Sequence, residues 1–146
     1  MQLVIDSSVF VAAFREQEKQ SEACLRLIKK IEFGEVSAVI PTTVLLEVVA
    51  AISRRTSDAQ LARRIGMRLV SFPTLSLIDL TTFRSLQYID LTADLKLTGM
   101  DLIVAGVAME FQLPLVTLDK ELQRKASSQV DVLSIQKLDR YKKRAP

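Results

Sequence analysis

The chain has 146 residues, of which 49% are hydrophobic and 25% are charged, and its net charge is +3. These values fit one globular domain with its own core and exclude a disordered or fibrous chain, while the mildly basic charge permits a polyanionic partner without requiring one. There is no histidine and one cysteine, which excludes hydrolysis through a histidine base, an internal disulfide and the usual zinc sites.

The first half of the chain alternates short apolar runs with helical patterns. Residues 3–5 predict a strand that ends at Asp6, and the pair Ser7 and Ser8 is suited to cap a helix over 9–14. Helical spacing of apolar residues then predicts helices and one strand in the order helix 21–33, strand 38–40, helix 44–55, and a helix capped by Asp58 that carries Leu61, Ile65 and Leu69.

The second half continues the alternation. A strand over 75–80 precedes a helix that begins after Thr81 and Thr82. That helix carries Phe83, Leu86, Ile89 and Ala93. The remaining predicted elements are an almost wholly apolar helix over 102–111, a strand over 115–117, a short helix over 119–125 and a strand over 130–135.

This order of elements predicts the fold class. Short apolar runs without polar alternation are typical of strands buried on both faces. We therefore expect one α/β domain over residues 1–136, with a short, mostly parallel central sheet of about five strands flanked by helices, and a basic tail over 137–146. No apolar run approaches the roughly 20 residues that span a bilayer, and no signal peptide is visible, so a soluble cytoplasmic protein is expected.

Four acids fall at informative places in this pattern. Asp6 directly follows the first strand, and Asp119 lies two residues past Thr117 in the fourth. Ligands of open α/β sheets bind beyond the carboxyl ends of the strands, although either aspartate could equally be a helix N-cap. Glu47 lies in a helix that is apolar nearly all round, and Asp101 opens another. A buried salt bridge for Glu47 and a capping role for Asp101 are the ordinary alternatives.

The four acids together are more informative than any one alone. The composition leaves carboxylates, hydroxyls, lysines or an oxygen-bound metal as the available chemistry. Carboxylates suit Mg²⁺ and Mn²⁺, and several of them cannot all be ionised side by side without a cation. The four phenylalanines Phe10, Phe14, Phe33 and Phe72 are expected in the core, with the lining of a groove as the alternative.

Four segments resemble the motifs of PIN domains and occur in the order of that family. They are residues 4–9 around Asp6, 41–48 ending in Glu47 and Val48, 99–105 around Asp101, and 115–119 ending in Asp119. The length is similar to that of the VapC toxins within the family. Leu102 departs from the alanine of many relatives, and the charged stretch 140–144 extends past their usual end.

The resemblance implies an endoribonuclease with one or two Mg²⁺ or Mn²⁺ ions, which leaves a 5′-phosphate and a 3′-hydroxyl. Asp6, Glu47 and Asp101 would hold the main ion, and Asp119 would complete the site directly or through water. The resemblance also implies a homodimer, inhibited by a small antitoxin whose C-terminal segment lies in a hydrophobic groove. The hydroxyls expected to support the site, or else to cap helices, belong to Ser7, Ser8 and Thr117.

RNA requires a cationic surface around such a site. The candidates are Arg54, Arg55, Lys120 and Arg124, and a solvated helix face is the alternative for each. A housekeeping RNA-processing nuclease without an antitoxin and an inactive module that only binds RNA or protein remain open. A phosphoryl-transfer enzyme is disfavoured because Ser8 stands where haloacid-dehalogenase-like enzymes have a second aspartate.

Overall fold

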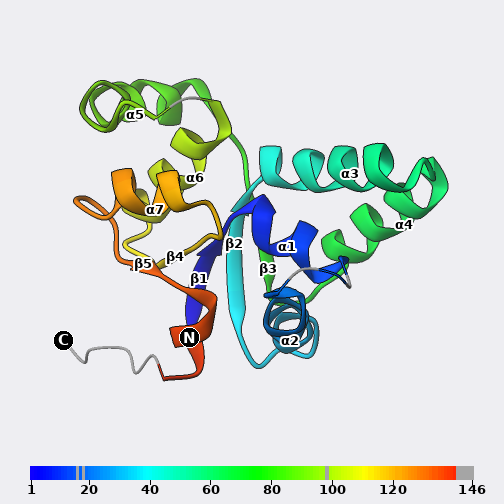
Figure 1. The fold of residues 1–146 in the computed structure, drawn as a ribbon. Coiled ribbons are helices and arrows are strands. Elements are labelled where there is room, and N and C mark those ends of the chain that lie inside the picture. Colours follow the sequence, from blue (N-terminus) through cyan, green and yellow to red (C-terminus); the bar gives the residue numbers. More distant parts are fainter. Residues whose placement is uncertain (16, 18, 98, 141–146) are drawn as a thin grey trace.

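The computed structural model describes residues 1–15, 17, 19–97 and 99–140. Its centre is a five-stranded sheet in the order β3-β2-β1-β4-β5, in which every neighbouring pair is parallel (Figure 1). The strands are β1 Gln2–Ile5, β2 Ser37–Pro41, β3 Leu75–Ile78, β4 Leu115–Val116 and β5 Val132–Leu133. The predicted α/β fold with a parallel five-stranded sheet is confirmed.

Helices pack on both sides of the strands, with α1 to α4 on one side and α5 to α7 on the other (Figure 1). Their bounds are α1 Ser7–Ala13, α2 Ser21–Glu32, α3 Thr42–Thr56, α4 Ala59–Val70, α5 Thr82–Leu95, α6 Gly99–Glu110 and α7 Lys120–Ala126, followed by the 3-10 helix η1 Ile135–Arg140.

The central strand is β1, which pairs with β2 on one side and β4 on the other. Val4 is the register partner of both Val39 and Leu115. Leu3, Val4 and Ile5 are fully buried, because helices cover both faces of the sheet at this strand. Since all strands are parallel, their carboxyl ends meet at one edge, and β1 and β4 deliver their following residues side by side.

Several predicted boundaries shift. Ser7 and Ser8 do not cap α1 but are its first two residues, and the cap is Asp6. The cap predicted at Asp58 is present, because its carboxylate accepts a hydrogen bond from the Leu61 amide at 2.8 Å. Strand β3 ends at Ile78, and β5 is limited to two residues. Both are edge strands, and each has a neighbouring strand on one side only, so fewer hydrogen bonds keep the chain extended.

Some of the apolar side chains predicted to pack inward lie on the surface. Phe10 and Phe72 are buried as predicted, but Phe14 and Phe33 are 42% and 73% exposed, so the core assignment is wrong for those two. Helix α5 buries Tyr88, Leu91 and Leu95. Its other apolar side chains face outward, and the most exposed are Phe83, Leu86 and Ile89, at 69%, 62% and 56%.

The C-terminal segment continues past the sheet into η1, which includes residues 137–140 of the predicted tail. Leu138 is buried there. Residues 141–146 of that tail lie outside the described residues. Across the described part of the chain, no helix is long and apolar enough to cross a membrane.

Candidate functional site

Asp6 is the most firmly held of the four acids. It follows β1 and is buried, and three donors reach the same carboxylate oxygen, Oδ2. The Ser8 hydroxyl donates at 2.5 Å, the Ser8 amide at 3.3 Å and the Thr117 hydroxyl at 2.9 Å. The Ser8 hydroxyl in turn accepts from the Leu118 amide at 3.0 Å. These bonds join the ends of β1 and β4 and fix Asp6 through one oxygen, without using Oδ1.

Asp119 combines an exposed position with a capping role. Its carboxylate accepts hydrogen bonds from the amides of Glu121 and Leu122 at 2.8 and 2.9 Å, so it is the N-cap of α7. The Asp119 amide donates to the Thr117 hydroxyl at 3.1 Å, and Thr117 is fully buried. The capping alternative for Asp119 is therefore present, and the same contacts tie it to the hydroxyl that holds Asp6.

Glu47 projects from α3 into a partly buried position. Its Oε2 atom is buried and has no hydrogen-bond partner among the described residues, so no salt bridge satisfies that oxygen. Burial raises the pKa of Glu47; a hydrogen bond from Ser7 lowers it, and the charges of Asp6 and Asp101 raise it further. An ionised carboxylate in this position requires a positive partner.

Asp101 is the third residue of α6 rather than its cap. Burial raises the pKa of its carboxyl, and so do the charges of Asp6, Asp119 and Glu121, while the charge of Lys125 lowers it. The four predicted acids are therefore electrostatic neighbours, with Asp6 acting on both Glu47 and Asp101.

The carboxylates are neighbours, but in the structure they do not form a preformed metal-binding site. Within the described residues, no three acidic, histidine or cysteine side chains stand close enough together to hold a metal ion as they are. The donor set nevertheless fits a hard cation, because it consists of carboxylates, includes a buried oxygen without a partner, and carries mutual repulsion that a cation would relieve.

Two further charged residues, Glu121 and Lys125, act on the carboxyl of Asp101, and Glu121 was not predicted as a site residue. Glu121 and Lys125 pair at 2.7 Å across one turn of α7, and the Lys125 amine also donates to the Lys96 carbonyl at 3.1 Å. The available signal was their spacing of four residues on a helix that begins at Asp119. Lys125 thereby connects α7 to the end of α5, close to the start of α6.

A pocket of about 350 Å³ contains part of this acidic centre. It is lined by Glu47, Ser7 and Ser8 together with Arg54 and Arg55 of α3. The predicted arginines therefore stand beside the acidic centre. Lys120 and Arg124, the other predicted RNA contacts, are exposed on α7 and do not line this pocket.

An apolar groove of about 500 Å³ adjoins the acidic pocket, between α1, α3 and α4. The two share Val11 and Arg55. Its other lining residues are Phe14, Arg15, Ile52, Thr56, Leu61 and Ile65. The exposed ring of Phe14 therefore forms part of the lining of this concave apolar surface.

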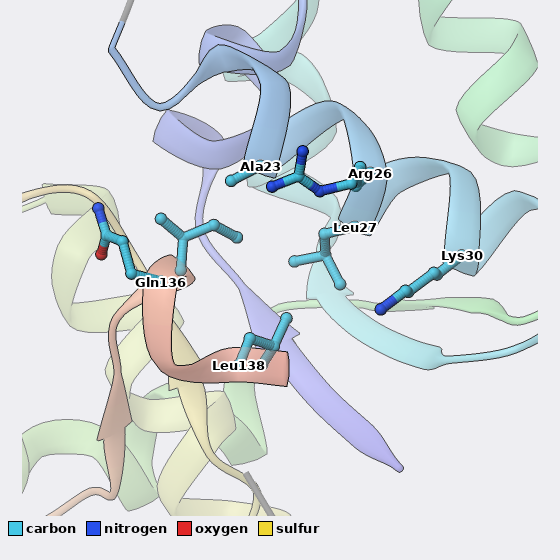
Figure 2. Close-up of a pocket in the computed structure, with 7 residues that line it drawn as sticks. Ala23, Arg26, Leu27, Lys30, Gln136 and Leu138 are labelled. Carbon is cyan, nitrogen blue, oxygen red and sulfur yellow. The ribbon is translucent and has the colours of Figure 1, made fainter. Parts of the chain in front are cut away.

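A third pocket, of about 230 Å³, lies between α2 and η1 (Figure 2). Arg26 and Lys30 lie on its α2 side, and Gln136 and Leu138 on its η1 side. Arg26 pairs with Glu22 at 2.6 Å, so its charge already has a partner. None of the predicted site residues lines this pocket.

Comparison with known families gives one match, to the PIN domain, over residues 3–127. No curated protein matches the chain. The matched range includes all four acids and ends before η1.

Solved structures of similar fold cover almost the whole chain. One is VapBC2 from Rickettsia felis, crystallised with a DNA fragment from its promoter, with 18% identity, a TM-score of 0.66, and coverage of 92% of this chain and 98% of that one. Another is VapC20 from Mycobacterium tuberculosis, a toxin that cleaves the sarcin-ricin loop, with 16% identity, a TM-score of 0.69, and coverage of 89% and 98%. PAE2754 from Pyrobaculum aerophilum has 19% identity, a TM-score of 0.67, and coverage of 94% and 92%.

Proposed function

From the premise that the chain belongs to the PIN domain family, we propose that it is an endoribonuclease that hydrolyses RNA phosphodiester bonds with Mg²⁺ or Mn²⁺. Asp6, Glu47 and Asp101 would hold the main ion, and Asp119 would complete the site. When bound, the ion would polarise the scissile phosphate and activate water. A cytoplasmic location is part of the same proposal.

The observation that carries the proposal is the set of four carboxylates on four elements at one edge of the sheet. The pKa values of Glu47 and Asp101 are raised by burial and by neighbouring acids, so these groups resist being charged together. A divalent cation removes that conflict. We propose that binding one or two such ions draws the carboxylates inward from the positions seen in the structure.

The other polar residues of the site have separate tasks in this proposal. Ser8 and Thr117 hold Asp6 through Oδ2 and leave Oδ1 to face the ion. Arg54 and Arg55 line the pocket that contains Glu47, so they would bind backbone phosphates of the RNA beside the acidic centre.

The decisive test is cleavage of a labelled structured RNA by purified wild-type and Asp6→Asn protein in Mg²⁺, in Mn²⁺ and in EDTA. The proposal requires cutting that depends on metal, disappears in Asp6→Asn, and leaves 5′-phosphate and 3′-hydroxyl ends. Absence of cutting together with absence of metal binding by calorimetry would favour the inactive binding module instead.

The apolar groove supports a protein partner for the same site. A structure from Klebsiella pneumoniae with 14% identity and a TM-score of 0.65 is a toxin-antitoxin complex. We propose that a small antitoxin lays an apolar segment along Phe14, Leu61 and Ile65 and so covers the adjoining acidic pocket.

A binding assay separates this role from that of a housekeeping nuclease without an antitoxin. Any short reading frame found next to the gene would be co-expressed with wild-type protein and with Leu61→Asp. Co-purification that is lost in Leu61→Asp, while RNA cleavage by the purified variant remains, is the expected result. If the reading frame is missing or its product does not bind, the housekeeping alternative is favoured.

A homodimer completes the proposal. The outward stripe Phe83, Leu86 and Ile89 on α5 is an apolar helix face of the kind that pairs with a second copy. The test of this surface concerns the whole molecule and is given below.

A further inference from the structure

The hydroxyl of Thr43 has an unusual environment for a threonine in a helix. Thr43 is the second residue of α3, and its Oγ1 atom is buried without a hydrogen-bond partner among the described residues. Helical threonines commonly donate to the carbonyl four residues earlier. Thr56 and Thr92 do this here, at 2.8 and 2.7 Å. For Thr43 the residue four positions earlier is Val39, which belongs to the sheet rather than to the helix.

The neighbour of this hydroxyl along α3 is Glu47. Residues four apart on a helix share one face. Thr43 Oγ1 and Glu47 Oε2 are the two buried side-chain polar atoms that have no partner in the part of the chain that the structure describes. Buried polar groups are nearly always hydrogen-bonded. Two such atoms without a partner on one helix face therefore indicate that a polar ligand or water binds between them.

Resting on the metal site of the proposed function, we infer that Thr43 is a positioning residue of that site. Its hydroxyl hydrogen-bonds a water molecule in the hydration shell of the divalent ion that Glu47 binds. Mg²⁺ keeps several of its waters when it is bound through carboxylates, so its shell requires protein partners beyond the direct ligands. Such outer partners orient the ligands and typically change metal affinity by about 10- to 100-fold.

The test is the substitution Thr43→Val, which keeps the branched shape and removes the hydroxyl. Calorimetry would measure Mn²⁺ affinity, and thermal unfolding in EDTA would measure the stability of the metal-free protein. We expect Mn²⁺ affinity to fall by about tenfold or more. The Tm of the metal-free protein should stay the same or rise, because the substitution removes a buried hydroxyl that had no partner.

Two variants complete the design. Thr43→Ser keeps a hydroxyl at the same position and should restore most of the Mn²⁺ affinity. Thr42→Val changes the neighbouring threonine of the same helical turn, on a different face from Glu47, and should bind Mn²⁺ like the wild type.

Equal Mn²⁺ affinity of Thr43→Val and the wild type would overturn the inference, because it would show that the hydroxyl does not serve the ion. If Thr43→Val keeps the Mn²⁺ affinity of the wild type but has a lower metal-free Tm, the hydroxyl contributes to the stability of the fold and not to metal binding. If the wild type binds no Mn²⁺ and matches Glu47→Gln in every titration, the metal site itself fails, and the role of Thr43 fails with it.

Discussion

At the scale of single residues, the acidic site depends on how each carboxylate is held. Asp6 has three hydrogen-bond donors on one oxygen, and Asp119 caps a helix, whereas Glu47 has a buried oxygen with no partner among the residues that the structure describes. The fold therefore holds two of the acids by hydrogen bonds, whereas Glu47 depends on a bound ligand, which in our proposal is the divalent ion. Asp101 lies between these cases, because it stands in the first turn of α6 without being its cap.

Asp101→Asn tests whether this residue acts through its charge. Asparagine keeps the size and the hydrogen-bonding capacity but cannot offer an anionic ligand. We expect metal-dependent RNA cleavage to fall by about a thousandfold or more, with no loss of Tm. Activity assays and thermal unfolding of the two proteins provide the comparison, and retained cleavage would assign Asp101 to helix packing alone.

The pH dependence of stability tests the repulsion between the acids. The pKa values of Glu47 and Asp101 are raised from ordinary values of 4.5 and 3.8, so the native state binds protons more tightly than the unfolded chain. The stability of the metal-free protein should therefore fall as the pH rises from those ordinary values through the raised ones. Glu47→Gln should increase the metal-free Tm at neutral pH, and this gain should shrink as the pH is lowered through the raised pKa of Glu47 towards its ordinary value of 4.5.

Thermal unfolding in EDTA across pH measures this effect, and Glu35→Gln is a control because Glu35 is an exposed acid outside the site. A metal-free Tm of Glu47→Gln below that of the wild type at neutral pH would contradict the repulsion.

The sequence was sufficient to choose the four acids but not to describe their states. Strand ends and motif order select Asp6, Glu47, Asp101 and Asp119 without coordinates. The contact between the Thr117 hydroxyl and Asp6 joins residues 111 positions apart, and no local pattern encodes it. The orphaned oxygen of Glu47 likewise depends on packing between α3 and its neighbours, which spacing along one helix does not specify.

At the scale of elements, α5 and α6 are joined by a polar cluster. The Arg84 guanidinium donates to both oxygens of Glu110, at 3.1 and 3.0 Å, and the Tyr88 hydroxyl donates to Glu110 at 2.5 Å. The Tyr88 ring also lies over Gly106, where a Cβ atom would come within 2.6 Å of it. This cluster holds α5 against the helix that carries Asp101.

Gly106→Ala should therefore loosen the α5–α6 contact. Because the Tyr88 ring is buried, it cannot swing away freely, and overpacking of this kind costs about 1–3 kcal/mol. Denaturant unfolding measures the loss of stability. In a Tyr88→Ala background the same substitution should cost clearly less, and an equal cost in both backgrounds would show that the ring is not the obstacle.

Helices were easier to predict than edge strands. The apolar spacing of α2, α3 and α4 and the Asp58 cap of α4 are local signals, and these helices lie close to where they were predicted. Strands β3 and β5 were predicted too long because each is an edge strand, with a partner on one side only. The surface position of the α5 stripe was also hidden, since helical spacing reveals a face but not what covers it.

At the scale of the whole molecule, the exposed stripe on α5 predicts self-association. Leu86→Asp places a charge in the middle of Phe83, Leu86 and Ile89, all more than half exposed. Light scattering should give a dimer for the wild type and a monomer for Leu86→Asp, with unchanged Tm at low concentration. Met67→Asp, at a residue 69% exposed on α4, is the matched control and should remain dimeric. A monomeric wild type would remove the dimer from the proposal.

The central position of β1 affects how the protein folds during its synthesis on the ribosome. The ribosome makes β1 well before one of its two neighbours, β4, and Thr117 reaches Asp6 across 111 positions. Pairing over so long a stretch makes closure of the sheet a late event in folding. A nascent chain thus carries Asp6 and Glu47 long before it has an assembled acidic centre. Under the proposed function, the nuclease cannot be active until β4 has been translated, and an inhibitor that is already present can bind it at that moment.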